Sequence, residues 1–206
     1  MTKSLYVAAF LIVSVTCGCN SSSGSGNGEE MYKGIPSTAY TIAENDSFIV
    51  FLNDEAIEDS IDGLPPIKQV SLWSYHKNKK EGRKILLSHP HTNMAFLNME
   101  HSVIIPLDSI PTITKVTILS WPNEPLKLLV EGCSDYRNVE SFIISEDSDS
   151  AICLPTSRGI VGVSEEDGLL IMQSYDYYEE GGRYNIIEAF DVKGIRVSSM
   201  NAKTRN

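Results

Sequence analysis

A group of aromatic residues in this sequence is spaced for sugar binding. Tyr175 and Tyr177 lie two positions apart in a segment that we expect to be a strand, so their rings share one face and Asp176 lies on the other. Aromatic rings stack on the apolar faces of sugars while neighbouring polar groups bind the hydroxyls. Tyr184, across the next turn, and Trp73 are further candidates. Cross-strand tyrosine pairs also stabilise sheets without any ligand, and from the sequence alone we favour this structural interpretation over sugar binding.

Histidine spacing raises the question of a metal site. His89 and His91 stand at i and i+2, and His101 follows ten residues later, within reach if 93–98 and 101–107 form a hairpin. Extended spacing of this kind can present two metal ligands on one face. A proline separates the first two histidines, and proline belongs at a turn or a sheet edge. We therefore favour surface histidines and expect neither a metal nor another cofactor.

The acidic segment 146–150 (EDSDS) has the oxygen-rich composition of a calcium loop. It lacks the glycine and the distant bidentate glutamate of an EF-hand, and an acidic hairpin turn explains it equally well.

Cysteine usage leaves two alternatives open. Cys133 and Cys153 lie twenty positions apart, and a disulfide between them is the natural hypothesis for an exported chain. Two free thiols buried in a β core are the alternative. No local motif supports a catalytic thiol.

Motifs of enzymes are missing from the sequence. It contains no G-x-S-x-G, H-E-x-x-H, P-loop or G-x-G-x-x-G pattern. We therefore lean towards a protein that is not an enzyme. The alternative is a hydrolase of the cell envelope that uses a pair of Asp and Glu side chains, which sequence spacing would not reveal.

The N-terminal segment has the features of an export signal. The run from Leu5 to Val15 contains eleven residues without a charge, and Lys3 precedes it. This length fits the apolar core of a signal peptide and is too short to span a bilayer as a helix. The polar run SSSGSGNG at 21–28 offers nothing that could pack on a buried helix.

The residues Thr16-Cys17-Gly18-Cys19 resemble the lipobox of bacterial lipoproteins. In that family a small residue precedes a cysteine that is lipidated and becomes N-terminal after cleavage. The resemblance implies a signal peptide over 1–18 and a lipid anchor on Cys19, with Cys17 as the second candidate. Because Asn20 stands where Asp retains many lipoproteins at the inner membrane, the resemblance favours the outer membrane and leaves its periplasmic or external face open.

Composition limits the remaining partners. The 206 residues carry 17 basic and 27 acidic side chains, a net charge of -10. Such a chain repels nucleic-acid phosphates, so we expect no nucleic-acid partner. Residues 19–38 are rich in Ser and Gly near their start and predict a flexible tether to the membrane.

The sequence pattern of residues 39–206 predicts an all-β domain. Short apolar and β-branched runs alternate with turn residues, as in Leu126–Glu131, where one face is expected to be buried and the other wet. Beyond 114–118 and 126–131, the predicted strands are 47–53, 67–76, 83–88, 93–98, 101–107, 141–146, 150–154, 159–163, 168–178, 183–192 and 195–200. A short helix is the weaker expectation for 54–61.

Turn chemistry is clearest in the last third of the domain. Gly168, Gly194 and the pair Gly181-Gly182 stand where tight turns need a positive φ, which predicts a four-stranded meander over 159–200. The expected architecture is an antiparallel β-sandwich or a partly closed barrel. Residues 120–125 could divide it into two subdomains.

Location, fold class and missing enzyme motifs together predict a lipid-anchored binding or accessory module of the cell envelope. Its expected partner is an envelope protein or a carbohydrate. A third alternative is a structural subunit of a surface assembly that pairs through exposed strand edges.

Overall fold

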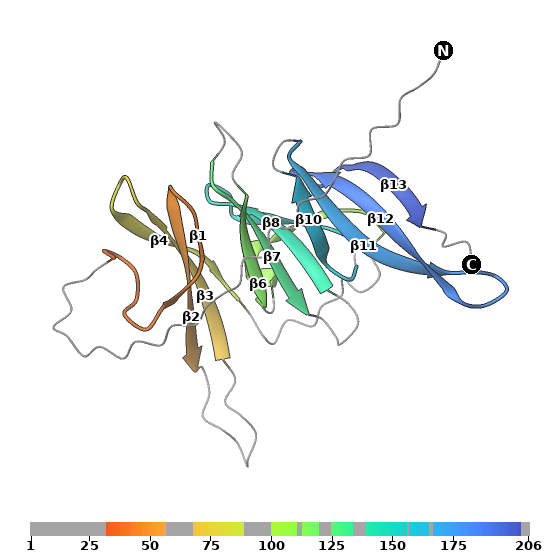
Figure 1. Cartoon of the computed structure of the whole chain (residues 1–206). Helices are drawn as coiled ribbons and strands as arrows, with labels where there is room; N and C mark the ends of the chain where they lie inside the picture. The colour runs from red at the N-terminus through yellow and green to blue at the C-terminus, as the bar shows by residue number, and fades with distance from the viewer. Residues whose placement is uncertain are drawn as a thin grey trace, which may run out of the picture. The chain divides into compact units, whose positions relative to one another are not determined.

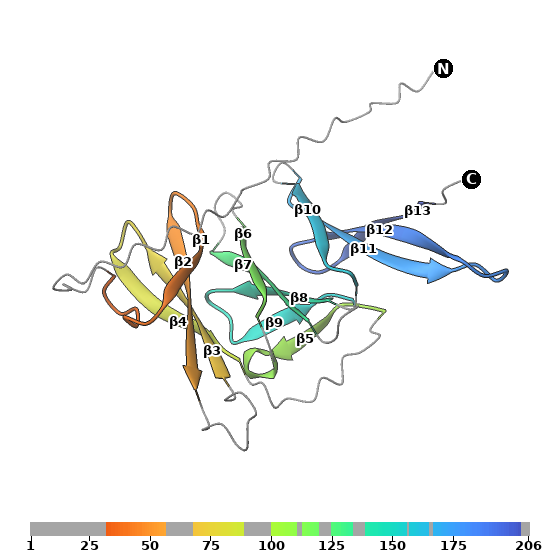
Figure 2. The ribbon, with the colours of Figure 1, turned by 60° about the horizontal axis from the view of Figure 1, so that its bottom comes forward.

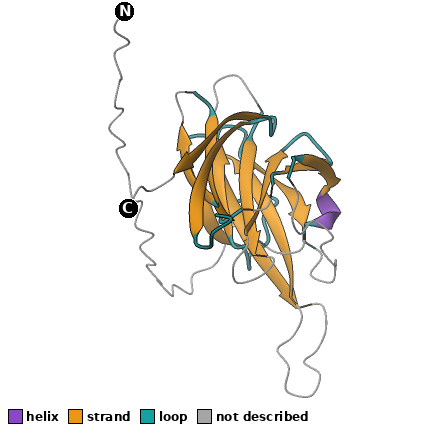
Figure 3. Cartoon of the chain, turned by 90° about the vertical axis from the view of Figure 1, so that its right-hand side faces the viewer, coloured by secondary structure: helices purple, strands orange, loops and turns teal. Residues whose placement is uncertain are grey.

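The computed structural model describes residues 32–56, 68–88, 100–110, 113–119, 125–133, 139–155, 157–164 and 167–202. Residues Tyr32–Asn206 form one compact unit. The described part consists of β-strands and one short 3-10 turn, η1, at Leu107–Ser109 (Figures 1 and 3). The strands are β1 (Tyr40–Glu44), β2 (Phe48–Ala56), β3 (Lys68–His76), β4 (Glu81–Leu87), β5 (Val103–Pro106), β6 (Lys115–Leu119), β7 (Lys127–Cys133), β8 (Val139–Ser145), β9 (Ser150–Cys153), β10 (Ile160–Ser164), β11 (Leu169–Tyr177), β12 (Arg183–Asp191) and β13 (Arg196–Ala202).

The strands form three antiparallel sheets. Sheet A has the order β1-β2-β3-β4, sheet B the order β5-β9-β8-β7-β6, and sheet C the order β10-β11-β12-β13. All neighbours are consecutive in the chain except β5 and β9, which pair across the intervening strands β6 to β8. The all-β class, the sandwich and the C-terminal meander predicted from the sequence are confirmed, and none of the three described sheets closes into a barrel.

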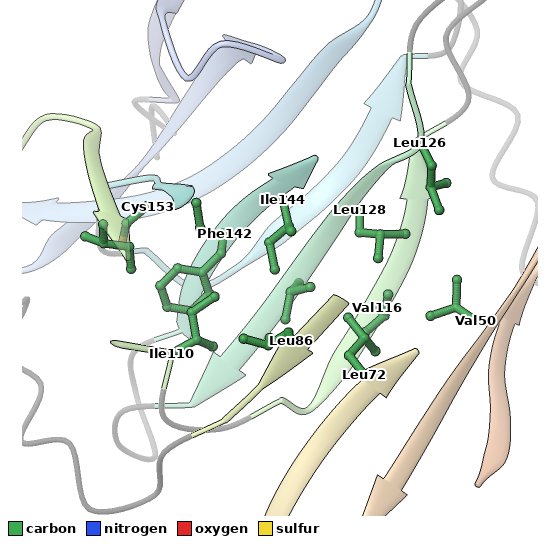
Figure 4. Close-up of a cluster of buried hydrophobic side chains, with 13 residues drawn as sticks. Val50, Leu72, Leu86, Ile110, Val116, Leu126, Leu128, Phe142, Ile144 and Cys153 are labelled. Carbon is green, nitrogen blue, oxygen red and sulfur yellow. The ribbon is translucent and has the colours of Figure 1, made fainter. Parts of the chain in front are cut away.

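One face of sheet B packs against sheet A. Val50, Leu72 and Leu86 of sheet A meet Leu128, Val130, Phe142 and Ile144 of sheet B in one buried cluster, which Figure 4 shows from within. Phe142 and Val130 are completely buried. Alternation along β7 and β8 brings these side chains to one face, as the sequence predicts for Leu126, Leu128 and Val130.

The other face of sheet B packs against sheet C, and here the sequence prediction is wrong. The face that carries Leu129 and Glu131 was expected to be wet, but Leu129 and Ile143 lie in a second buried cluster with Leu170, Met172 and Phe190 of sheet C. Five consecutive residues of β8, Glu140–Ile144, are therefore buried. A strand covered on both faces loses the apolar–polar alternation by which a half-buried strand is recognised.

Sheet A is also covered on its second face, by the chain that precedes it. The ring of Tyr32 lies 5.0 Å from that of Phe51 and 4.9 Å from that of Tyr75 (centroid distances), and Ile35 and Ala39 pack on the same cluster. The predicted tether, 19–38, therefore extends too far, because residues from Tyr32 onward belong to the folded unit. Its earlier part lies outside the described residues.

Three further expectations need correction. Residues 54–56 continue strand β2 instead of starting a helix, and 57–61 lie outside the described residues. A boundary at 120–125 does not divide the domain, because β6 and β7 on either side of it are paired neighbours. Strand β1 was not predicted, and the predicted strand 93–98 lies outside the described residues. No helix in the described ranges is long and apolar enough to cross a membrane.

A buried carboxylate links sheet B to sheet C. Glu131 is 5% exposed; its Oε1 accepts a hydrogen bond from the backbone N–H of Ile160 at 2.9 Å, and its Oε2 lies 2.8 Å from Nζ of Lys115. The approach requires Gly159, since a Cβ there would stand 2.9 Å from Oε1 and the residue has a φ of +100°. One carboxylate thus satisfies the first amide of β10 and fixes the entry of the chain into sheet C.

This role predicts the effect of replacing Glu131. Glu131→Ala leaves the Ile160 amide without an acceptor and should lower the free energy of unfolding by about 1–3 kcal/mol. Glu131→Gln should cost less, since its amide oxygen can still accept that hydrogen bond. Chemical denaturation checks both, with Glu44→Ala as control; Glu44 pairs with Lys77 at an exposed site, so its loss should cost below about 1 kcal/mol. A Glu131→Ala effect no larger than the control would contradict the role.

Candidate functional site

The candidate site lies on the hairpin formed by β11 and β12. The two strands pair without interruption from Leu169↔Asp191 to Tyr177↔Arg183. The turn that joins them uses Gly181 and Gly182 at φ of +93° and +83°, as their position in the sequence predicts. Strand β10 pairs with β11 only as far as Met172, and β13 pairs with β12 only as far as Asn185. The end of the hairpin is therefore a two-stranded ribbon that extends past both neighbours (Figures 1 and 2).

Two tyrosines share one face of this ribbon, as predicted. The rings of Tyr175 and Tyr177 meet edge to face, with centroids 5.6 Å apart and an interplanar angle of 84°. Tyr177 is 61% exposed and Tyr175 is half-buried. In the register Asn185 lies opposite Tyr175 and Arg183 opposite Tyr177, so an amide and a guanidinium share this face with the rings.

Two arginines stack on the same ring. The guanidinium carbon of Arg158 lies 4.5 Å from the ring centroid of Tyr175, and that of Arg183 lies 5.5 Å from it. The loop before β10 positions Arg158 through its backbone, since its N–H donates to the carbonyl of Gln173 at 2.9 Å. We call Tyr175, Tyr177, Arg158, Arg183 and Asn185 the tyrosine face. Four of the five are exposed and Tyr175 is half-buried, so the face is open to a ligand.

Tyr184 lies on the opposite face of the ribbon. Its hydroxyl donates to Oδ2 of Asp176 at 3.1 Å, and its ring lies 4.8 Å from that of Tyr178. The hydrogen bond to Asp176 raises the pKa of the Tyr184 phenol above its usual value. Tyr184 and Asp176 therefore stabilise the ribbon from behind, and the structure separates Tyr184 from the two tyrosines with which the sequence grouped it.

Trp73 belongs to a different sheet. It lies in β3 of sheet A, half-buried, with its indole N–H donating to Oγ of Ser71 at 2.9 Å and the amine of Lys84 5.5 Å from its ring. The grouping of Trp73 with the tyrosines is not supported.

Conversely, the sequence prediction missed Arg158, Arg183 and Asn185. Pairing the two predicted strands on either side of Gly181 and Gly182 could have placed Arg183 and Asn185 next to the tyrosines. The position of Arg158 depends on a contact made by a loop, which the sequence pattern does not show.

The other predicted chemistries gain no support from the described residues. His101 is exposed, while His89 and His91 lie outside the described ranges. No set of three His, Cys, Asp or Glu side chains within the described part could hold a metal ion. The acidic segment 146–150 contains the turn between β8 and β9, where the Ser145 hydroxyl donates to Asp147 and lowers the pKa of that exposed carboxyl.

The carboxylate pair that a hydrolase would need is not formed by the two buried glutamates of sheet B. Glu131 lies opposite Ser141 and Glu140 opposite Gly132 in the register of β7 and β8. Because alternate residues of a strand point to opposite faces, Glu131 and Glu140 lie on opposite faces of the sheet. Each is buried, so neither lies in an open cleft.

The predicted Cys133–Cys153 disulfide is not formed in the structure. Cys153 is a free thiol, 1% exposed, in the core between sheets A and B. Strand β8 separates β7, which carries Cys133, from β9, which carries Cys153, and the register places the two residues well apart along the strands. Burial, with a smaller contribution from the nearby Glu140, raises the pKa of the Cys153 thiol to about 12.

Comparison with known proteins finds no match: no family model, no curated protein and no solved structure is similar to this chain. Fold and site together define an all-β protein of three stacked sheets that carries an exposed aromatic and cationic surface at one end of its C-terminal sheet.

The state of Cys153 can be tested by alkylation. Iodoacetamide at pH 8 should leave Cys153 unmodified in the native protein and modify it in denaturant, because a thiol with a pKa near 12 is protonated at that pH and buried. Peptide mapping by mass spectrometry identifies the modified cysteine. A cross-linked peptide containing Cys133 and Cys153, or rapid native alkylation at Cys153, would contradict the structure.

Proposed function

We propose that this protein is a non-enzymatic binding module of the cell envelope that binds carbohydrate on its tyrosine face. The observation that carries the proposal is the exposed ring of Tyr177 next to the half-buried ring of Tyr175, the Asn185 amide and two guanidinium groups. Stacking on rings and hydrogen bonding to amide and guanidinium donors are the two interactions by which proteins hold sugars.

The position of the rings supports binding over a purely structural role. Tyrosine pairs that stabilise sheets do so by excluding water from their contact, but Tyr177 keeps 61% of its surface accessible. The cost of exposing such a ring is offset when a ligand covers it. Because the face is exposed and shallow, we expect weak binding to a single site, with a dissociation constant on the order of 10⁻⁵ to 10⁻³ M.

A protein partner is the second candidate function. Strand β13 is an edge of sheet C, so its outer backbone groups are free to pair with a strand of another chain by β-augmentation, and Val197 (57%) and Met200 (71%) are exposed on it. We place carbohydrate first because edge strands occur in every open sheet, whereas the aromatic rings with adjacent amide and guanidinium donors are particular to the tyrosine face.

The lipobox-like segment supports the cellular setting of this proposal. In that setting a lipid on Cys19 holds the domain at the outer membrane through a polar chain. The acidic domain is repelled from anionic headgroups, so the tether leaves the tyrosine face available to glycans of the envelope or its surroundings.

Substitution of the rings tests the binding function. Tyr177→Ala should weaken carbohydrate binding about tenfold or more, because the stacking surface is lost, while Tyr177→Phe should retain most of it. A glycan array followed by calorimetry on the best ligand provides the measurement. Tyr40→Ala is the matched control, because Tyr40 is also an exposed strand tyrosine (51%, against 61% for Tyr177) and lies on sheet A. Equal losses in both alanine variants would overturn the site.

Metabolic labelling tests the anchor. Cells expressing the protein and grown with an alkyne-bearing fatty acid should yield labelled protein, Cys19→Ser should abolish the label, and Cys17→Ser should retain it. Loss of label in Cys17→Ser alone would move the anchor to that residue. An unlabelled wild-type protein would refute lipidation.

A further inference from the structure

The tyrosine face carries two positive charges on a strongly acidic chain, and a neutral sugar would use only the hydrogen-bond donors of these groups and not their charge. We infer that its ligand is an acidic oligosaccharide, whose carboxylate or sulfate groups are held by Arg158 and Arg183 while its ring stacks on Tyr177. This inference rests on the proposed function and specifies its substrate class.

Neither arginine is neutralised by the described part of the protein. The ion pairs found there join Lys77 to Glu44, Lys115 to Glu131 and Arg196 to Glu188. Acidic side chains outnumber basic ones by 27 to 17, so carboxylates are available as ion-pair partners for most arginines of this chain. Two arginines over one ring without a carboxylate partner therefore form a local positive site in a negative surrounding.

The nearest acidic groups of the ribbon are already engaged or lie beyond it. Asp176 lies on the opposite face, where it accepts hydrogen bonds from the Tyr184 hydroxyl and from the backbone N–H of Tyr177. Glu179 and Glu180 lie in the turn between β11 and β12, outside the paired part of the ribbon.

Stacking leaves the arginines able to bind an anion. A guanidinium that lies over a ring uses its flat surface, and its N–H donors remain at the edge, where they can form paired hydrogen bonds with two oxygens of one anionic group. The guanidinium carbons lie 4.5 and 5.5 Å from the same Tyr175 centroid and so at most about 10 Å from each other, a span that the acidic groups of one oligosaccharide can cover. The ring also holds the two long side chains in place before the ligand arrives, which reduces the entropy lost on binding.

A sugar acid fits the whole face better than an acidic peptide does. A uronate residue or a sulfated hexose carries its charge beside an apolar ring face and several hydroxyls. These three features match the guanidinium groups, Tyr177 and the Asn185 amide respectively. An acidic peptide would use the cations and leave the exposed aromatic surface unexplained.

The test compares charged oligosaccharides with neutral forms of the same backbone. Oligogalacturonate, oligomannuronate and chondroitin sulfate oligosaccharides are measured by calorimetry against the purified full-length protein, each beside its carboxyl-reduced form and, for chondroitin, its desulfated form. At least one acidic probe should bind about tenfold or more tightly than its neutral counterpart, and this preference should fall as salt is raised. The two chondroitin derivatives show whether the carboxylate or the sulfate is recognised.

Arginine variants then assign the preference to the face. Arg158→Gln and Arg183→Gln should each weaken binding of the acidic probe about tenfold and weaken binding of its neutral form by a clearly smaller factor, while Arg158→Lys should recover part of the loss of acidic binding. Arg83→Gln, which removes an exposed arginine from sheet A, is the control and should change neither. Thermal unfolding verifies that the variants are folded.

The outcomes separate the two proposals. Equal affinity for acidic and neutral forms, or arginine variants without effect while Tyr177→Ala still abolishes binding, overturns the acidic class and leaves the carbohydrate function standing. A polyglutamate peptide that binds as tightly as the sugar acids overturns the inference in favour of acidic peptides. Absence of binding to acidic and neutral probes alike overturns both proposals.

Discussion

The burial of sheet B on both faces is the constraint on which the rest of this structure depends. Sheets A and C each pack one face on it, and the two buried clusters that hold the domain together meet through the same strands, β7 and β8. Runs such as Leu128-Leu129-Val130 and Phe142-Ile143-Ile144 supply an apolar side chain to each face in turn. Burial of this kind is the main favourable term in folding, so the central layer determines the positions of both outer layers.

Among the residues that the structure describes, sheet C is covered on one face only, and the candidate site lies on its other face. Two close approaches hold it on sheet B: Gly159 against Glu131, and Gly194, whose carbonyl accepts a hydrogen bond from the Ser102 hydroxyl at 2.6 Å. The β11–β12 ribbon extends from this fixed base. Its end has no core of its own, so aromatic pairs, stacked arginines and the Tyr184–Asp176 hydrogen bond take over the role that buried apolar side chains have elsewhere.

Local patterns allowed most of the fold and two of the five residues of the tyrosine face to be predicted from the sequence. Glycines such as Gly168 and Gly194 determine their own turns, and alternation along β11 predicts that Tyr175 and Tyr177 share a face. What could not be predicted depends on contacts between distant segments. The wet face assigned to Leu129 and Glu131 was wrong because only the packing of sheet C shows that it is covered. Arg158 was missed for the same reason. It lies in the loop before β10, and only the folded structure shows that this loop brings it to Tyr175.

The pairing of β5 with β9 has a consequence for the order of folding. Sheets A and C, and the remainder of sheet B, are made of neighbours in the chain, so each can form as soon as its own segment is free. Strand β5 must wait, because its partner Ser150–Cys153 follows only after β6, β7 and β8. Until β9 is in place, β5 has no partner strand, so the central layer closes last along this edge. A chain of this design therefore exposes an unpaired strand edge while it folds, when aggregation is the main competing reaction.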